Sequence, residues 1–243
     1  MRRDYLGIAR NLSLAIAFLA FVLVCISGPG TKAGWFPWQV GLGLLTFAFC
    51  LGAAAAVVAL VLIVMLAFPR LRVRPWMPIA AFCLGIAAAA PPAMMLAQDK
   101  SVPRIHDVTT DMADPPAFVA LMEVRKKSPN GFAYGGEAIA AQQRQGYPEL
   151  KPLVVKTGPR DTMQRAIDAA RSLGWEVVAS DAAAGRIEAT DTTRWFGFKD
   201  DIVVRIRPEG EGSRVDVRSV SRVGLSDIGA NARHIRSYLD KLS

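Results

Sequence analysis

The fold of the C-terminal half is decided by residues 201–222, which read DIVVRIRPEGEGSRVDVRSVSR. Apolar and polar residues alternate over 201–207 and again over 214–222. Such alternation is typical of a strand with one buried face, because successive side chains point to opposite sides of a sheet. The residues between the two runs, 208–212, have the composition of a hairpin loop. The stretch therefore predicts two antiparallel strands joined by a tight turn.

The flanking residues extend this pair of strands. Residues 175–180 and 186–190 predict two earlier strands, and 159–174 predicts a helix before them, with proline at its first position and glycine at its end. A second helix is expected to begin near 226–227, where Ser and Asp provide N-cap chemistry. The order helix, four-stranded antiparallel meander, helix predicts an α+β domain with two layers. Residues 99–158 contain many prolines, and only short helices are expected there, at 117–126 and 137–144.

The first 98 residues have a different composition. They hold 7 of the 29 Lys and Arg residues and one of the 21 acids, which leaves 22 and 20 for residues 99–243. Three long apolar runs predict transmembrane helices near 8–27, 40–68 and 76–96, and the prolines at 91 and 92 are expected to kink or end the third. The chain is thus expected to comprise a membrane region, 1–98, and a soluble domain, 99–243.

Loop charge predicts the orientation of these helices. Arg70, Arg72 and Arg74 lie between the second and third runs, whereas the link after the first run carries Lys32. Basic loops stay in the cytoplasm, so the N-terminus is expected there and the C-terminal domain on the opposite side. In a bacterium with two membranes, this places the protein in the inner membrane and the domain in the periplasm. Cleavage of the first run as a signal peptide is an alternative, and it would not change this orientation.

Charge and cysteine content exclude several functions. Six units of the net charge of +8 come from residues 1–98 (7 minus 1), so the soluble half has only +2 (22 minus 20), which argues against nucleic-acid binding. The second and third runs contain no charged residue, which argues against an ion-coupled transporter. All three cysteines lie in apolar runs, so the soluble half has neither a disulfide nor a cysteine-ligated metal.

Charged side chains gather on the outward face of the predicted meander. We expect a solvated face with cross-strand charge pairs, and the alternative is a site for an anion or a partner, since arginine binds carboxylates and phosphates bidentately. The candidate residues of this face are Arg186, Glu188, Arg205, Asp216, Arg218 and Arg222.

Polar side chains also lie between the last predicted strand and the last helix. We expect them to form a hydrogen-bonded network, and the alternative is a Ser-His-Asp hydrolase. Asp227 and His234 are seven residues apart, too far for a direct pair on one straight helix. The candidate residues of this polar seam are Ser219, Ser221, Asp227, Asn231 and His234.

Two smaller groups of side chains could also carry a function. Trp195, Phe196 and Phe198 surround a glycine and are expected to pack in the core, or alternatively to contact the bilayer or an apolar ligand. His106, Asp107 and Asp111 could be metal ligands, but their spacing favours side-chain capping of turns. We therefore expect no metal, no cofactor and no catalytic residue.

Several separated motifs of the soluble half resemble one bacterial family. They are residues 104–111 (RIHDVTTD), 185–190 (GRIEAT), 195–201 (WFGFKDD), 216–222 (DVRSVSR) and 226–231 (SDIGAN). Together they are similar to the family known only as domain of unknown function 1499, over roughly residues 103–243. The resemblance implies a domain often tethered by N-terminal spans, and it supplies no reaction or catalytic residue.

These observations favour a non-enzymatic, membrane-anchored envelope protein that binds a membrane-protein partner or a second copy of itself, for example as a subunit of a complex. A lipid- or small-ligand-binding module is the first alternative, for which Trp195→Ala and Arg218→Ala are expected to abolish binding and spare folding. A hydrolase that uses Ser219 and His234 is the second alternative.

Overall fold

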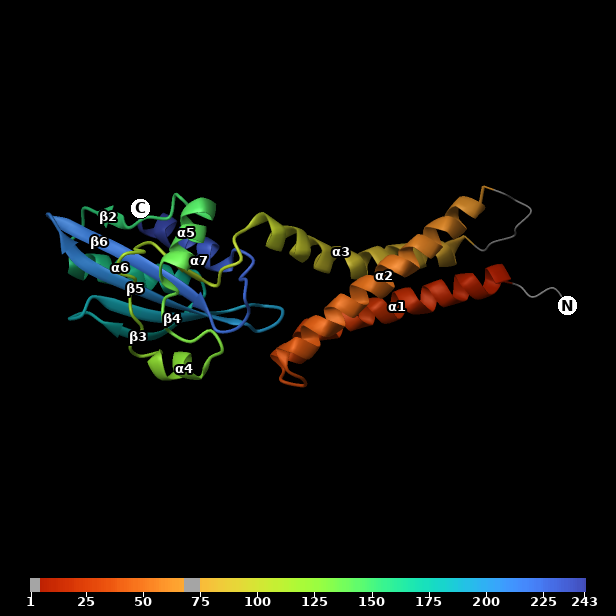
Figure 1. Ribbon diagram of the computed structural model, residues 1–243, viewed down its shortest axis with the longest axis horizontal. Coiled ribbons are helices and arrows are strands. Elements are labelled where there is room, and N and C mark those ends of the chain that lie inside the picture. Colours follow the sequence, from red (N-terminus) through yellow and green to blue (C-terminus); the bar gives the residue numbers. More distant parts are fainter. Residues whose placement is uncertain (1–4, 68–74) are drawn as a thin grey trace. The chain divides into compact units, whose positions relative to one another are not determined.

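The computed structural model describes residues 5–67 and 75–243. The chain divides into two compact units (Figure 1): a helical unit up to residue 97, which also includes 194–197, and a second unit of residues 98–193 and 198–243. The three arginines used above to predict the orientation lie outside the described residues. Each unit is described below by itself.

The predicted membrane helices are present in the structure. They are α1 (Tyr5–Lys32), α2 (Trp38–Met65) and α3 (Trp76–Ser101). All three are long and apolar enough to cross a membrane, which indicates membrane anchoring. Of the two expected effects of Pro91 and Pro92, a kink or an end of the third helix, the end is wrong, because α3 continues through both to Ser101.

Small residues let two of these helices meet backbone to backbone. A Cβ atom at Gly52 of α2 would lie 2.8 Å from the carbonyl oxygen of Gly85 in α3, and a Cβ atom at Gly85 would lie 2.7 Å from the carbonyl oxygen of Gly52. Both distances are too short for real atoms, so glycine is required on both sides of this crossing. The small residues therefore serve packing within the helical unit.

Gly52→Leu is expected to force α2 and α3 apart and to destabilise the helical unit by about 1–3 kcal/mol, the usual cost of overpacking. Gly43→Leu is the matched control, since Gly43 lies in the same helix and a Cβ atom there would have no neighbour within 4 Å among the described residues. Thermal unfolding of the full chain in detergent measures both variants. Equal melting temperatures for the two variants would contradict this close crossing.

The second unit contains a six-stranded antiparallel sheet (Figure 1). The strands run in the order β1-β6-β5-β4-β3, and β2 also pairs with β6. The four-stranded meander is present as β3 to β6, but the predicted strand count is wrong, because two short strands pair with β6 as well. The strands are β1 (Asp107–Thr109), β2 (Leu153–Val155), β3 (Glu176–Asp181), β4 (Arg186–Thr192), β5 (Lys199–Glu209) and β6 (Gly212–Ser221).

The main core lies between one face of the sheet and the helices α6 and α7. Ile202, Val204 and Ile206 of β5 are buried in it, as their alternation predicts, together with Ile235 and Tyr238 of α7. Helix α6 begins with proline after an extended glycine, which agrees with the predicted start. The helices of this unit are α4 (Met122–Lys127), α5 (Gly136–Gly146), α6 (Pro159–Ser172) and α7 (Ala230–Leu242).

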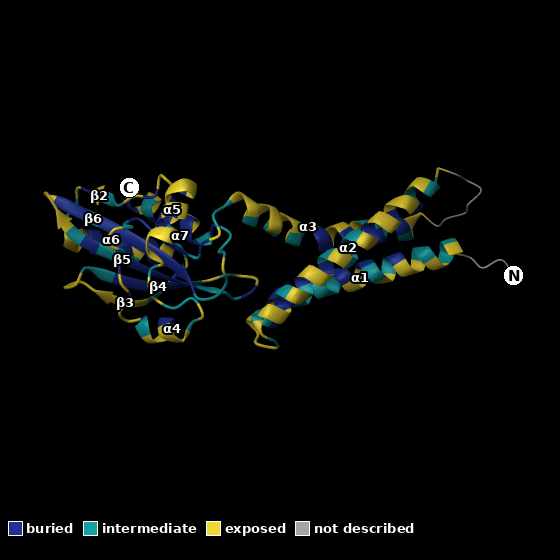
Figure 2. Ribbon diagram, in the orientation of Figure 1, coloured by how far each residue is buried: buried dark blue, intermediate teal, exposed yellow. Residues whose placement is uncertain are grey.

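The opposite face of the sheet is also covered. Val203 and Val220 of this face form a second buried cluster with Phe118 and Leu121, which belong to the segment 110–134 that includes α4. Strand β6 is consequently buried along almost its whole length (Figure 2). We call residues 110–134 the cover segment. The predicted two-layer arrangement is therefore incomplete, because the cover segment adds a third layer.

Candidate functional site

The charged face of the sheet is buried beneath the cover segment. Arg218 is 4% exposed and binds Asp107 bidentately, with Nε–Oδ1 and Nη2–Oδ2 distances of 3.0 and 2.7 Å. Arg222 binds Asp201 in the same way, with Nε–Oδ2 and Nη2–Oδ1 distances of 2.9 and 2.8 Å. The expectation of a solvated face is therefore wrong at these positions.

The remaining charged residues of this face are also paired within the domain. The carboxylate of Asp216 accepts hydrogen bonds from Arg205, Arg207 and Arg214. Arg186 lies 3.2 Å from the carboxylate of Glu188, which is 1% exposed. These arginines bind the domain's own carboxylates, so the charged face acts as internal scaffolding in this structure.

The aromatic group around Trp195 and the three candidate metal ligands do not come together as sites in the structure. Trp195 is 46% exposed, whereas Phe196 is buried, and both lie in the connection between β4 and β5. Asp111 accepts the N–H groups of Ala113 and Asp114, as expected for a carboxylate that caps a turn. The carboxylate of Asp107 is bound to Arg218, so the two carboxylates among the three candidate metal ligands serve other contacts.

The polar seam, in contrast, is brought together around one side chain. The amide nitrogen of Asn231 donates to the carbonyl oxygen of His106 and to the hydroxyl of Ser221, both at 3.0 Å. Its amide oxygen accepts from the hydroxyl of Ser219 at 2.6 Å. The carboxylate of Asp227 accepts the backbone N–H of Asn231 near the start of α7. The predicted polar seam is therefore a buried hydrogen-bonded network.

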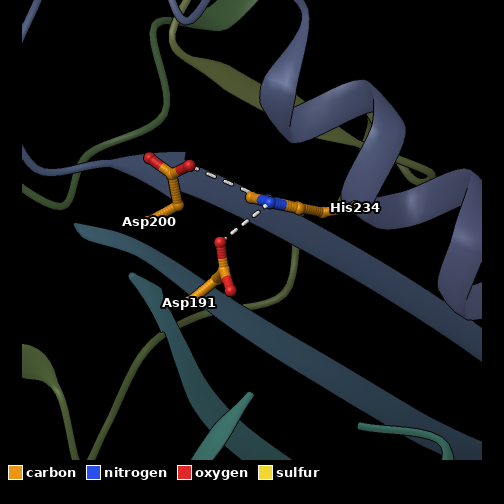
Figure 3. A group of neighbouring side chains, drawn as sticks. All are labelled: Asp191, Asp200 and His234. Carbon is orange, nitrogen blue, oxygen red and sulfur yellow. Dashed lines mark ion pairs between the residues drawn. The ribbon is translucent and has the colours of Figure 1, made fainter. Parts of the chain in front are cut away.

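His234 extends this network toward two carboxylates that the sequence analysis missed. Its Nε2 atom lies 3.3 Å from Oδ2 of Asp191, and its Nδ1 atom lies 3.8 Å from Oδ2 of Asp200 (Figure 3). Asp191 on β4 and Asp200 on β5 are direct partners in the strand register. One oxygen or nitrogen atom from each of the three side chains lies within 4.8 Å of the others. We call Asp191, Asp200 and His234 the carboxylate–histidine cluster.

The two carboxylates of this cluster have different environments. The side chains of Asp191 and His234 are 24% and 17% exposed, and that of Asp200 is 5% exposed. A hydrogen bond from His234 lowers the pKa of Asp191. Burial raises the pKa of Asp200, although His234 and a hydrogen bond from Ser221 oppose this shift. The cluster is therefore partly open to solvent at Asp191 and His234 and closed at Asp200.

Ser219, His234 and Asp191 have the residue types of a catalytic triad, but Ser219 cannot act as a nucleophile. The hydroxyl oxygen of Ser219 lies 3.4 Å from Nδ1 of His234, and Asp191 lies at the other ring nitrogen. However, Ser219 is fully buried and its hydroxyl donates to Asn231. A substrate carbonyl cannot reach this oxygen, so a hydrolase that uses Ser219 is not supported by the geometry.

The fold and the cluster together define a membrane-anchored α+β domain with a partly open group of ionisable side chains. The family model described as "Protein of unknown function (DUF1499)" matches residues 107–242, which is more than half of the chain. The chain therefore belongs to the DUF1499 family, and the resemblance seen in its motifs is confirmed. No curated protein matches the chain.

Proposed function

We propose that this chain is an inner-membrane protein whose C-terminal domain faces the periplasm and acts as a binding module. The observation that carries this proposal is the carboxylate–histidine cluster, which stays partly exposed. In contrast, the arginines Arg205, Arg218 and Arg222 on the other face are engaged by carboxylates of the domain. This arrangement supports a binding role for the part of the domain where β4 ends and β5 begins.

A role as subunit of an envelope complex follows if the bound molecule is a protein. Trp195, in the connection between β4 and β5, is 46% exposed, and the exposed part of this residue supports recognition of a partner, since tryptophan is enriched at interfaces. A lipid or a small ligand is the second candidate, and the same tryptophan favours it. In the helical unit, Gly52 and Gly85 already pack against each other, so the domain is the better candidate for partner binding.

The orientation is tested with single cysteines in a chain whose three native cysteines are replaced by alanine. In intact cells, a membrane-impermeant maleimide that enters the periplasm is expected to label Ser243→Cys. Arg72→Cys, in the basic link, is expected to be labelled only after the membrane is permeabilised, because basic links stay in the cytoplasm. The reverse pattern would place the domain in the cytoplasm and contradict the proposal.

Native mass spectrometry of the full chain, purified from its own membrane in mild detergent, tests the binding role. Additional mass from a stoichiometric protein would support the complex subunit. Additional mass of a small molecule, lost in Trp195→Ala, would support the ligand-binding module. A bare monomer under mild conditions would contradict both.

A further inference from the structure

The hydrogen-bond network fixes the tautomer of His234. The carbonyl oxygen of His106 can only accept, so it orients the Asn231 side chain with its nitrogen toward His106 and Ser221. The oxygen of Asn231 must then accept the proton of the Ser219 hydroxyl. The Ser219 oxygen consequently faces Nδ1 of His234, 3.4 Å away, as an acceptor. Nδ1 therefore carries a hydrogen.

With a hydrogen on Nδ1, a neutral imidazole presents the lone pair of Nε2. This lone pair points toward the carboxylate of Asp191, whose Oδ2 atom lies 3.3 Å away. Two electron pairs at this distance repel each other, so the arrangement requires a positive charge between them. That charge is either a proton, held by Nε2 or by the carboxyl group, or a metal ion.

The surroundings of the two carboxylates favour a metal ion. Asp191 and Asp200 lie directly opposite each other in the strand register, where like charges are destabilising. In the part of the chain that the structure describes, neither carboxylate has Lys or Arg within 4.0 Å, whereas Asp107 on the opposite face has Arg218. A divalent ion would supply the positive charge that these two facing carboxylates lack.

We infer that Asp191, Asp200 and His234 form a binding site for a divalent transition-metal ion. The inference rests on the binding role proposed above and names the ligand of that site. Metal–ligand bonds of about 2.0–2.2 Å place ligand atoms roughly 3.4 Å apart in a tetrahedral site. The candidate ligand atoms of the three side chains already lie within 4.8 Å of one another.

The donor set narrows the choice of ion. One imidazole nitrogen and two carboxylates suit Zn²⁺ or Mn²⁺ better than soft ions such as Cu⁺. Nδ1–H of His234 donates to Ser219, which is the arrangement that orients a metal-binding histidine in many sites. Three protein ligands leave a fourth position for water or for a donor atom of the bound partner. The ion would thus connect the domain to the molecule that it binds.

The inference is tested by titrating the purified full chain in detergent with Co²⁺ and monitoring the visible absorption of the bound ion. Zn²⁺ is then added to displace Co²⁺. We expect one ion per chain. His234→Gln and Asp191→Asn are each expected to weaken binding by at least about 10- to 100-fold, since even the loss of an outer hydrogen bond has this effect in metal sites. His106→Gln, at the other of the chain's two histidines, is the control, and this variant should bind Co²⁺ normally. Binding that survives His234→Gln, or no binding by the unmodified chain, overturns the inference.

Thermal unfolding with and without Zn²⁺ gives an independent readout. Zn²⁺ should raise the melting temperature of the unmodified chain and leave that of Asp191→Asn unchanged. In a chelator, Asp191→Asn loses the contact of this carboxylate with His234, so the zinc-dependent change in melting temperature carries the test. A less stable variant in the chelator, with no zinc effect on either protein, would show a structural ion pair instead.

These outcomes are separable from those of the proposed function. A protein partner found by mass spectrometry without metal binding would overturn the metal site and leave the binding module intact. A C-terminus labelled only after permeabilisation would overturn the orientation and leave the metal titration valid.

Discussion

Asp201→Ala is expected to lower the free energy of unfolding of the C-terminal domain by about 3–5 kcal/mol, the cost of breaking a buried ion pair by removing one partner. Asp201 is fully buried and serves three side chains. Its carboxylate accepts two hydrogen bonds from Arg222 and one from the Thr190 hydroxyl at 2.8 Å, and it lies 3.4 Å from Nη1 of Arg125. The substitution would leave two arginines without this counter-charge.

The burial of Arg125 explains why the expected loss of unfolding free energy is large. Its side chain is fully buried above the ring of Phe118, and its Nε and Nη2 atoms have no hydrogen-bond partner among the described residues. Burial lowers the pKa of Arg125, and Asp201 is the main group that opposes this shift. Without Asp201, the cover segment can relieve the buried charge only by opening.

Chemical denaturation of the full chain in detergent, followed by near-ultraviolet circular dichroism, measures this effect. Asp168→Ala is the matched control, because Asp168 is exposed on α6 and its carboxylate accepts a hydrogen bond from the exposed side chain of Gln164. It should change the unfolding free energy by no more than about 0.5 kcal/mol. A loss below about 1 kcal/mol for Asp201→Ala would show that the ion pair does not hold the cover segment.

The meander could be predicted because each of its long strands alternates over seven or more residues. β1 and β2 could not, since three residues are too few for a periodic pattern. β1 is fully buried and pairs with residues 218–220 of β6, more than a hundred positions later in the chain. Such a pairing is set by tertiary packing and has no local signal.

The burial of the charged face also depends on distant residues. Arg218 carries a full charge, so alternation alone placed it toward solvent, but its partner Asp107 lies 111 residues away. A signal was present in Val203 and Val220, two apolar residues on this charged face, which indicate that another part of the chain covers it. For the same reason, Arg218→Ala cannot serve as a test of ligand binding, since it would leave Asp107 buried without a counter-charge.

The sequence analysis does not predict the carboxylate–histidine cluster, because the predicted strands are too short at the ends that join β4 to β5. One predicted strand ends at residue 190 and the next begins at residue 201, so Asp191 and Asp200 fall in the predicted loop. In the structure, Thr190 pairs with Asp201 and the ladder continues by one step to Asp191 and Asp200. Extending the predicted hairpin by one residue pair would have placed both carboxylates on the face that carries α7 and His234.

Glu188→Gln is expected to open the cover segment and to cost about 3 kcal/mol, from the loss of a charged acceptor at several hydrogen bonds. The buried carboxylate of Glu188 accepts the backbone N–H groups of Val119, Ala120 and Leu121 at 2.8, 3.0 and 2.8 Å. These residues lead into α4, whose unpaired N–H groups favour a negative charge. Glutamine keeps one acceptor oxygen and places an N–H₂ donor against an N–H donor.

Hydrogen–deuterium exchange of the full chain in detergent locates this effect. Amides of residues 119–127 should exchange faster in Glu188→Gln, while those of β5 and β6 change less, because the main core on the other face does not involve Glu188. Glu211→Gln, at an exposed turn between β5 and β6, is the control and should exchange as the unmodified chain does. Uniformly faster exchange throughout the domain would mean that the cover segment and the sheet unfold as one unit. Unchanged exchange at 119–127 would mean that Val203 and Phe118 hold the cover segment without help from the carboxylate.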